Sequence, residues 1–336
     1  MLKGYTKQEI SWMMYDWANS AHSVIIVTLL PIFFDTVAGY TADSVSSMST
    51  WGYATSIAML IVALAAPFLG VFGDIRGMRK KLFSFFMLLG VAACAGMAFT
   101  PGMDFTSGPV AAGKVASLIL VLYIVSVIGF DASAIYYDAF LTDVTTEDRM
   151  DKVSTMGYGL GYIGGSTIPL LIFLIMNLVG VPMLTCLAFV FGLTAVWWLA
   201  FSLPLLKNCE QTSGKPYEKG DVARSIKGVG TTIKEIIANK PMLIYILSYF
   251  FYIDGVHTVI SMATTYGTNL GLDSTGMMLA LLLVQILGLP FCLLYIKCSE
   301  KFGARTMVGF GICVYMFICI FAFFMNSLWQ FWGVAG

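Results

Sequence analysis

Long apolar stretches alternate with short polar connections along the whole chain. Nine apolar stretches of about 19 to 26 residues occur, at 17–38, 51–73, 82–100, 115–137, 153–176, 183–204, 241–266, 275–297 and 306–325. A helix that rises ~1.5 Å per residue needs about 20 residues to cross a hydrocarbon core of ~30 Å. The pattern therefore predicts an all-α polytopic membrane protein with about nine spans.

The longest polar stretch runs from Leu205 to Lys240, and no soluble domain is expected. Its later part repeats apolar residues at spacings of four and three positions, at Val222, Ile226, Val229, Ile233 and Ile236. This period predicts an amphipathic helix that lies at the membrane surface. Near the N-terminus, Thr6 and Glu9 have the spacing of a capping box, so a helix is expected to begin before the first apolar stretch.

The amino-acid composition agrees with a membrane protein and does not favour a nucleic-acid partner, a cofactor or a metal. Of 336 residues, 58% are hydrophobic and 11% are charged, and the mean hydropathy is +0.84. Soluble domains contain about 45–50% apolar and about 25% charged residues. The formal net charge is zero, so no basic excess favours a nucleic-acid partner. The seven cysteines are expected to be small buried hydrophobes, and neither a cofactor nor a metal is expected.

The positions of lysine and arginine predict the orientation. Of the 19 basic residues, 18 fall at the N-terminus, in the even-numbered connections or in the long polar stretch, and only Lys114 lies on the other side. Basic residues bias short connections towards the cytoplasm. We therefore expect a cytoplasmic N-terminus in a multi-pass protein of the cell (inner) membrane.

Two pairs of segments resemble each other within the chain. Residues 19–25 read NSAHSVI and residues 254–260 read DGVHTVI, and these contain the only two histidines. Residues 74–79 read DIRGMR and residues 300–305 read EKFGAR, which share the pattern acid-x-x-Gly-x-Arg. Such self-similarity indicates that the spans before and after the polar stretch are two copies of one unit.

The repeat predicts the domain organisation. We expect a six-helix bundle at 1–204, a cytoplasmic linker with the amphipathic helix at 205–240, and an incomplete C-terminal bundle at 241–336. Facing six-helix units with a substrate site between them are typical of secondary transporters. Because only three spans follow the linker and a tenth apolar run is starting at 332–336, we expect a C-terminally truncated sequence.

Three motifs resemble a known family. Residues 70–80, GVFGDIRGMRK, resemble the loop signature of the major facilitator superfamily, from which Ile75 and Met78 depart. Residues 15–21 (YDWANSA), 137–141 (YDAFL) and 254–260 resemble the branch of unknown major facilitators that is related to the vacuolar amino-acid effluxers. The resemblance implies a twelve-helix fold, alternating access and amino-acid efflux.

The signature and its echo are candidates for a cytoplasmic gate. Two glycines permit close packing and a tight turn, and Arg79 is expected to pair with an acid of the 143–151 segment, which would latch the cytoplasmic side. The alternative is that the basic residues only set the orientation. The candidate gate residues are Gly70, Asp74, Arg76, Gly77, Arg79, Glu300 and Arg305.

Polar residues inside the apolar stretches are candidates for the substrate or coupling site. Asn19 and His22, and likewise Asp254 and His257, lie three positions apart, so each pair shares one helix face. The two faces are predicted to meet across a central cavity, with Asp254 and His257 holding a proton and the other pair binding substrate. The alternative is a structural hydrogen-bonded pair. Asp131 and Gln285 are further candidates for the same site.

The leading functional prediction is a secondary transporter for a small-molecule solute, surrounded by membrane lipid, with protons as the candidate coupling ion. A non-transporting receptor or scaffold is the first alternative. An intramembrane enzyme is the second, although the chain contains no H-E-x-x-H motif. The glycines of the fifth stretch formally match a dinucleotide fingerprint at Gly159, Gly161 and Gly164, but without a preceding strand they are expected to pack helices.

Overall fold

The computed structural model describes residues 4–41, 47–214, 216 and 221–335. Nine of the helices within these ranges are long and apolar enough to cross a membrane, and they coincide with the nine predicted stretches. The fold class expected from the sequence is therefore confirmed.

The first six spans form one group of helices. The described connections are short, and residues 42–46, between the first two spans, lie outside the described residues. The elements of this group are α1 (Lys7–Ala38), α2 (Ser47–Gly73), α3 (Arg79–Met97), α4 (Pro109–Val144), α5 (Met150–Gly161), the π-helical turn η3 (Tyr162–Thr167), α6 (Ile168–Leu178) and α7 (Met183–Asn208), with the 3₁₀ turns η1 (Thr100–Gly102) and η2 (Glu147–Arg149) between them.

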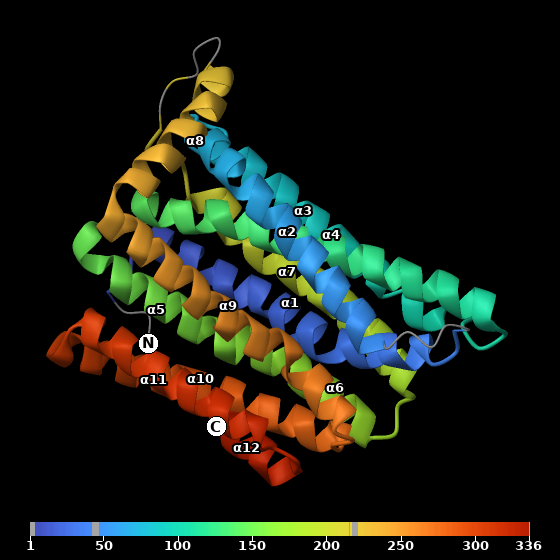
Figure 1. Cartoon of the computed structure of the whole chain (residues 1–336). Coiled ribbons are helices and arrows are strands. Elements are labelled where there is room, and N and C mark those ends of the chain that lie inside the picture. Colours follow the sequence, from blue (N-terminus) through green and yellow to red (C-terminus); the bar gives the residue numbers. More distant parts are fainter. Residues whose placement is uncertain (1–3, 42–46, 215, 217–220, 336) are drawn as a thin grey trace.

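The remaining helices follow the polar stretch. They are α8 (Asp221–Ala238), α9 (Lys240–Asn269), α10 (Ser274–Phe302), α11 (Ala304–Phe323) and α12 (Leu328–Ala335). In Figure 1, α8 lies across one end of the bundle, and α10, α11 and α12 lie along the edge farthest from α2, α3 and α4. Helix α5 lies between α1 and α10 and contacts both.

Local sequence signals account for several helix boundaries. Thr6 and Glu9 form the predicted capping box at the start of α1, with Glu9 N–H donating to Thr6 Oγ1 at 3.1 Å. The predicted amphipathic helix is α8, which contacts α2 and α9. Ile233 on it is exposed, whereas the side chains of Val222 and Ile226 lie outside the described residues.

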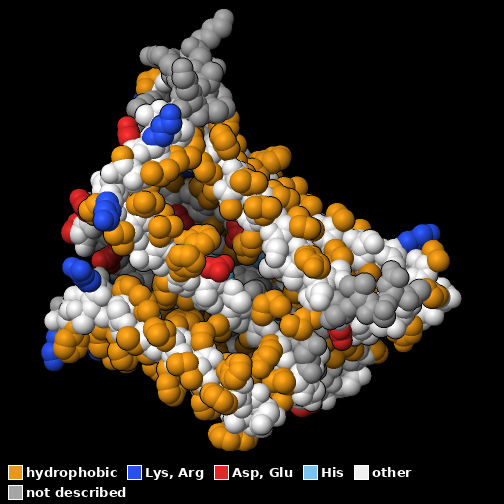
Figure 2. Space-filling view, viewed as in Figure 1, with side chains coloured by type: hydrophobic (Ala, Val, Ile, Leu, Met, Phe, Trp, Pro, Cys, Tyr) orange, Lys and Arg blue, Asp and Glu red, His pale blue; other side chains and the backbone are white. Residues whose placement is uncertain are grey.

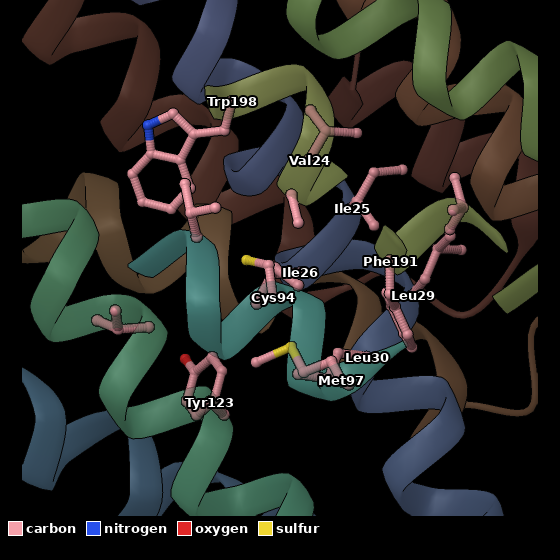
Figure 3. Close-up of a cluster of buried hydrophobic side chains, with 14 of the residues drawn as sticks. Val24, Ile25, Ile26, Leu29, Leu30, Cys94, Met97, Tyr123, Phe191 and Trp198 are labelled. Carbon is pink, nitrogen blue, oxygen red and sulfur yellow. The ribbon is translucent and has the colours of Figure 1, made fainter. Parts of the chain in front are cut away.

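The main apolar core lies inside the first group of helices. Figure 3 shows part of it, where α1, α3, α4 and α7 converge on Ile25, Cys94, Tyr123, Phe191 and Trp198. A second, much smaller cluster joins α10 to the end of the chain through Met277, Ala280, Met325 and Phe331. The two groups therefore differ in how firmly their helices are packed together.

Glycines of the fifth span face α1 at intervals of four residues. A Cβ atom added to Gly157, Gly161 or Gly165 would collide with α1, at Asp16, Ser20 and the Trp17 backbone. Small residues at this spacing let two helices approach closely. The predicted packing role of the glycines is confirmed, whereas the π-helical turn that contains Gly165 was not expected from the sequence.

The surface in Figure 2 is predominantly apolar, as expected for helices that face lipid. Most of the visible lysine and arginine side chains lie along the edge formed by α8 and the ends of the helices near it. A hollow opens on this face between α2, α8 and α9, and acidic side chains are visible inside it.

Candidate functional site

The first group of charged residues surrounds Arg79, the first residue of α3. Its side chain is almost fully buried, forms an ion pair with Asp143 at the end of α4, and donates to the Ala139 carbonyl at 3.0 Å. Asp74 of the loop signature is 3.9 Å from the guanidinium and remains exposed. The pairing of Arg79 with an acid of the 143–151 segment, expected from the sequence, is thus present.

The start of the linker completes this group. Asp143 Oδ1 accepts from the backbone N–H groups of Thr212 at 3.1 Å and Ser213 at 2.9 Å, and from both hydroxyls. Gln211 accepts from the Gly77 N–H at 2.8 Å and donates to the Gly73 carbonyl at 3.0 Å. We call residues 211–213 the strap, because they join the α2–α3 turn to the end of α4.

A second charged group joins the start of α1 to the end of α4. Glu9, which is 1% exposed, accepts from Arg149 Nε at 2.9 Å on Oε1 and from Arg149 Nη2 at 2.9 Å on Oε2. Thr145 Oγ1 donates to the same carboxylate at 2.7 Å. Both groups lie within the first six spans and the strap, so the gate role predicted for the signature residues remains a prediction.

The two copies of the acid-x-x-Gly-x-Arg pattern share a backbone conformation. Gly77, between α2 and α3, has φ +80°, and Gly303, between α10 and α11, has φ +81°. Only glycine enters this left-handed region without strain. Arg76 and Arg305 are exposed, Gly70 has open space beside it, and the Glu300 side chain lies outside the described residues. The matching turns support the internal repeat.

A polar cluster inside the first group was not among the predicted sites. Tyr137 of α4 donates to Asp16 Oδ2 of α1 at 2.7 Å, and Trp12 stacks on the Tyr137 ring with centroids 4.3 Å apart. The hydroxyl oxygens of Tyr15 and Ser133 are 2.8 Å apart and share a hydrogen bond. The available signal was the pair of Tyr-Asp dipeptides in the two resemblance motifs, 15–21 and 137–141.

His22 and Asn19 are buried in the same region. The His22 ring stacks on Phe130 with centroids 4.8 Å apart and lies 5.2 Å from the Trp198 ring. Among the described residues, neither ring nitrogen has a hydrogen-bond partner. Asn19, 8% exposed, lies beside the Tyr15 hydroxyl. Both side chains therefore belong to the interior of the first six spans.

The other predicted site residues are more dispersed. Asp254 and His257 are exposed on α9, so in this conformation they do not join His22 in one cluster. Asp131 on α4 and Gln285 on α10 are half-buried, and each has a buried oxygen without a partner among the described residues. Their roles in binding or coupling remain predictions. Within the described ranges, no group of three metal-ligating side chains occurs.

Comparison with known proteins defines the family. A family model described as "Vacuole effluxer Atg22 like" matches residues 5–336. The chain belongs to this Atg22-like family. The MFS-type transporter YxiO of Bacillus subtilis (strain 168) is 39% identical over 343 residues, which cover 100% of this chain and 77% of that protein. The Atg22-like chain is therefore a multi-pass membrane transporter of the MFS type, a family that is typically non-enzymatic.

More distant relatives match only part of the chain. Autophagy-related protein 22-1 of Penicillium rubens is 24% identical over 177 residues, which cover 49% of the Atg22-like chain and 30% of the fungal protein. Autophagy-related protein 22-1 of Sclerotinia sclerotiorum is 23% identical over 205 residues, which cover 55% and 34%. The matched segments thus cover about half of this chain and about a third of these fungal proteins.

Solved structures establish the fold of the Atg22-like chain. The xylose transporter XylE from E. coli, in a partially occluded inward-open conformation, aligns with a TM-score of 0.62 at 15% identity, covering 98% of this chain and 83% of that one. A crystal structure of a D-xylose-proton symporter aligns at 0.61 and 16% identity, covering 98% and 79%. The predicted major-facilitator-type helix bundle is confirmed.

Proposed function

We propose that this Atg22-like chain is a secondary active transporter that moves a small solute across the cell membrane by alternating access. The observation that carries the proposal is the contact between the two groups of helices. Helix α10 packs against α5 and η3, and this contact contains glycine on both sides. Gly159 faces Leu289 and Cys292, and Gly288 faces the Tyr162 ring.

Such a contact suits a rocking motion. Leu289 and Tyr162 rest on glycine backbone at this contact, so the helices can tilt about it while these two side chains stay in place. A second contact joins α1 and α9. Near the ends of α1 and α9 that lie away from α8, one small pocket is lined by residues of both groups, including Phe34, Met48, Trp51 and Thr268.

The hollow between α2, α8 and α9 lies near the end that carries most basic residues (Figure 2). Contact at the outer ends together with a hollow at the cytoplasmic side supports a state that is accessible from the cytoplasm. The family description as an effluxer supports outward movement. Amino acids are the first substrate class to test, as implied by the motifs at 15–21, 137–141 and 254–260.

The test is solute exchange in liposomes that contain the purified protein. Vesicles are loaded with a mixture of unlabelled amino acids, and uptake of each labelled amino acid is measured against protein-free vesicles. Transporter function predicts accelerated exchange for at least one member. A folded protein that exchanges none of them, and none of a wider panel of small metabolites, would support the receptor or scaffold alternative.

A cross-linked variant provides the matched control. Cysteines are introduced as Met48→Cys and Thr268→Cys, in a background where exposed Cys313 and Cys319 are replaced by serine. A short bifunctional thiol reagent should join the two groups of helices at their outer ends and stop exchange. Each single-cysteine variant treated with the same reagent should continue to exchange. Unchanged exchange by the cross-linked protein would contradict alternating access.

A further inference from the structure

Asp16 is a carboxylate enclosed by protein near the cytoplasmic end of α1. It lies nine residues beyond Lys7, about 14 Å along the helix axis, and is 8% exposed. Its Oδ2 atom accepts the hydrogen bond from Tyr137 at 2.7 Å. A Cβ atom on Gly157 would lie 2.5 Å from the same oxygen, so α5 covers the carboxylate directly.

The groups that face Asp16 are neutral or negatively charged. Tyr15 is its neighbour on α1, Tyr137 donates to it from α4, and Asp138 on α4 and Tyr158 on α5 are near enough to interact with it electrostatically. Within the described part of the chain, the ion pairs join Arg79 to Asp74 and Asp143, and Arg149 to Glu9, and none of them includes Asp16.

An ionised carboxylate in such a place is poorly compensated. Removing a charge from water is costly unless a cation or several hydrogen-bond donors replace the lost hydration. Tyr137 supplies one neutral donor, and the nearby Asp138 carboxylate opposes a second negative charge. The neutral acid avoids this cost, because it keeps the bond from Tyr137 and adds only an uncharged O–H group.

We propose that Asp16 is the site that carries a proton during the transport cycle, with Tyr137 orienting the carboxyl group. This inference rests on the proposed transporter function. The carboxylate takes one proton from water on one side of the membrane and becomes a carboxylic acid, and it returns that proton to water on the other side. Tyr137 remains a neutral donor throughout, so one proton moves and no other group changes its charge.

Helix α5 links this site to the second group of helices. Gly157 faces Asp16 on α1, while Gly159, two residues later, faces Leu289 and Cys292 on α10. A tilt of α10 against α1 therefore displaces the turn of α5 that covers the carboxylate. The π-helical turn η3 follows at once, at Tyr162–Thr167, and such turns accommodate a local shift of a helix. Movement of this cover would open Asp16 to water on one side of the membrane in one state, and the opposite tilt would open it to water on the other side.

Infrared difference spectroscopy tests the site without a known substrate. Purified protein in liposomes is titrated between about pH 5 and about pH 9, across the range where a shielded carboxyl group exchanges its proton. A carbonyl-stretch band of a protonated carboxylic acid should appear and disappear, and Asp16→Asn should remove it. Asp104→Asn is the matched control, because Asp104 lies in an outer turn where Asn keeps the bonds from the Thr106 and Ser107 N–H groups.

Three further variants make the assignment specific. Tyr137→Phe removes the donor, so the band should persist and move to higher frequency. Asp131→Asn and Asp254→Asn should leave the band unchanged; loss of the band in Asp254→Asn instead would assign the proton to the pair predicted from the sequence. If Asp16→Asn does not fold, the band position in Tyr137→Phe decides, and an unmoved band overturns the proposal.

Flux measurements separate this proposal from the function on which it rests. Liposomes that contain a pH-sensitive dye report proton movement while a labelled amino acid is exchanged or taken up. The proposal expects proton movement in the wild type and solute exchange without proton movement in Asp16→Asn. Solute transport without proton movement, and without the infrared band, would overturn the proton site and leave the transporter function intact. The band without any transport would show that Asp16 binds a proton, but it would overturn the transporter function and with it the role of Asp16 in a transport cycle.

Discussion

The two histidines of the chain occupy equivalent positions in a repeated segment but opposite environments. His22 on α1 is 3% exposed between Phe130 and Trp198, whereas His257 on α9 is exposed. Asn19 and Asp254, their partners three residues earlier, differ in the same way. The two copies of the repeat therefore share a helical segment. Packing, however, gives the polar residues of the two copies different environments.

The same contrast extends to whole spans. The most apolar window of α1 is 65% buried inside the protein, and the corresponding windows of α9 and α11 are 0% buried. A helix that packs on all sides tolerates little change in volume or charge, whereas a helix that faces lipid tolerates apolar substitution readily. Equivalent substitutions in the two groups should consequently have very different effects on stability.

The largest difference is expected for charge removal. Arg149→Met should give the largest loss in the free energy of unfolding, because it leaves the buried Glu9 carboxylate without its cation. Lys297→Met, on an exposed position of α10, should change it by less than about 0.5 kcal/mol. Thermal unfolding in detergent compares the two variants. Equal stability of both would show that the Glu9–Arg149 pair does not fasten α1 to α4.

A methyl group added to a glycine should have the next largest effect. In Gly129→Ala the new Cβ would lie 2.5–2.8 Å from backbone atoms of Gly90 and Phe86, so α3 and α4 must move apart. This separation should lower the free energy of unfolding by about 2 kcal/mol. Gly309→Ala on α11 meets nothing within 4 Å and should be neutral or stabilising by up to about 1 kcal/mol. Midpoints of thermal unfolding distinguish these outcomes, and a stable Gly129→Ala protein would contradict the close approach of the two helices.

Replacement of the buried histidine should change the free energy of unfolding by a smaller amount and in the opposite direction. His22→Phe should stabilise the fold by about 1 kcal/mol, because the new ring keeps the stacking and removes two polar atoms without hydrogen-bond partners. Exposed His257 is not one of the buried groups that lack a partner, so no comparable stabilisation is expected from His257→Phe. Loss of stability in His22→Phe, measured by the same thermal assay, would mean that the imidazole has a bound partner such as water. Loss of exchange in a stabilised protein would place His22 in the transport site.

The smallest effect is expected at Asp254. Asp254→Asn should preserve expression and change the free energy of unfolding by less than about 0.5 kcal/mol, because the side chain is exposed. Asn19→Leu, the counterpart in α1, removes a polar group beside the Tyr15 hydroxyl and should cost about 1 kcal/mol. Chromatographic monodispersity after heating compares them. A larger loss in Asp254→Asn would reveal a structural contact at that residue.

Much of the fold follows from local sequence, and much of the site does not. Continuous apolar runs predicted the nine spans, and the capping box and the 4-3-4-3 period predicted the start of α1 and the presence of α8. These features depend on residues that are near each other in the chain. Hydropathy alone placed the fourth span at 115–137, but α4 runs from Pro109 to Val144, because a helix continues beyond the hydrocarbon wherever its polar ends are solvated.

The Asp16–Tyr137 pair depends on a contact between residues 121 positions apart in the chain. A Tyr-Asp dipeptide carries no information about its partner helix, so only the resemblance motifs marked these residues. The sequence did not predict the π-helical turn either, because one extra residue per turn does not change the composition of an apolar stretch. The Arg79–Asp143 pair was expected, since a loop between two spans and the next loop on the same side are close in any such bundle.

The strap shortens the effective tether between the two groups of helices. Measured along the sequence, 205–240 is a long connection, but Gln211, Thr212 and Ser213 are bonded to the first group and α8 starts at Asp221. Seven residue steps from Gly214 to Asp221 reach at most about 25 Å. The start of helix α8 therefore stays within this distance of Gly214. The connection limits how far the second group of helices can move from the first. Inserting residues between Gly214 and Asp221 should widen the range of motion without altering a contact inside either group.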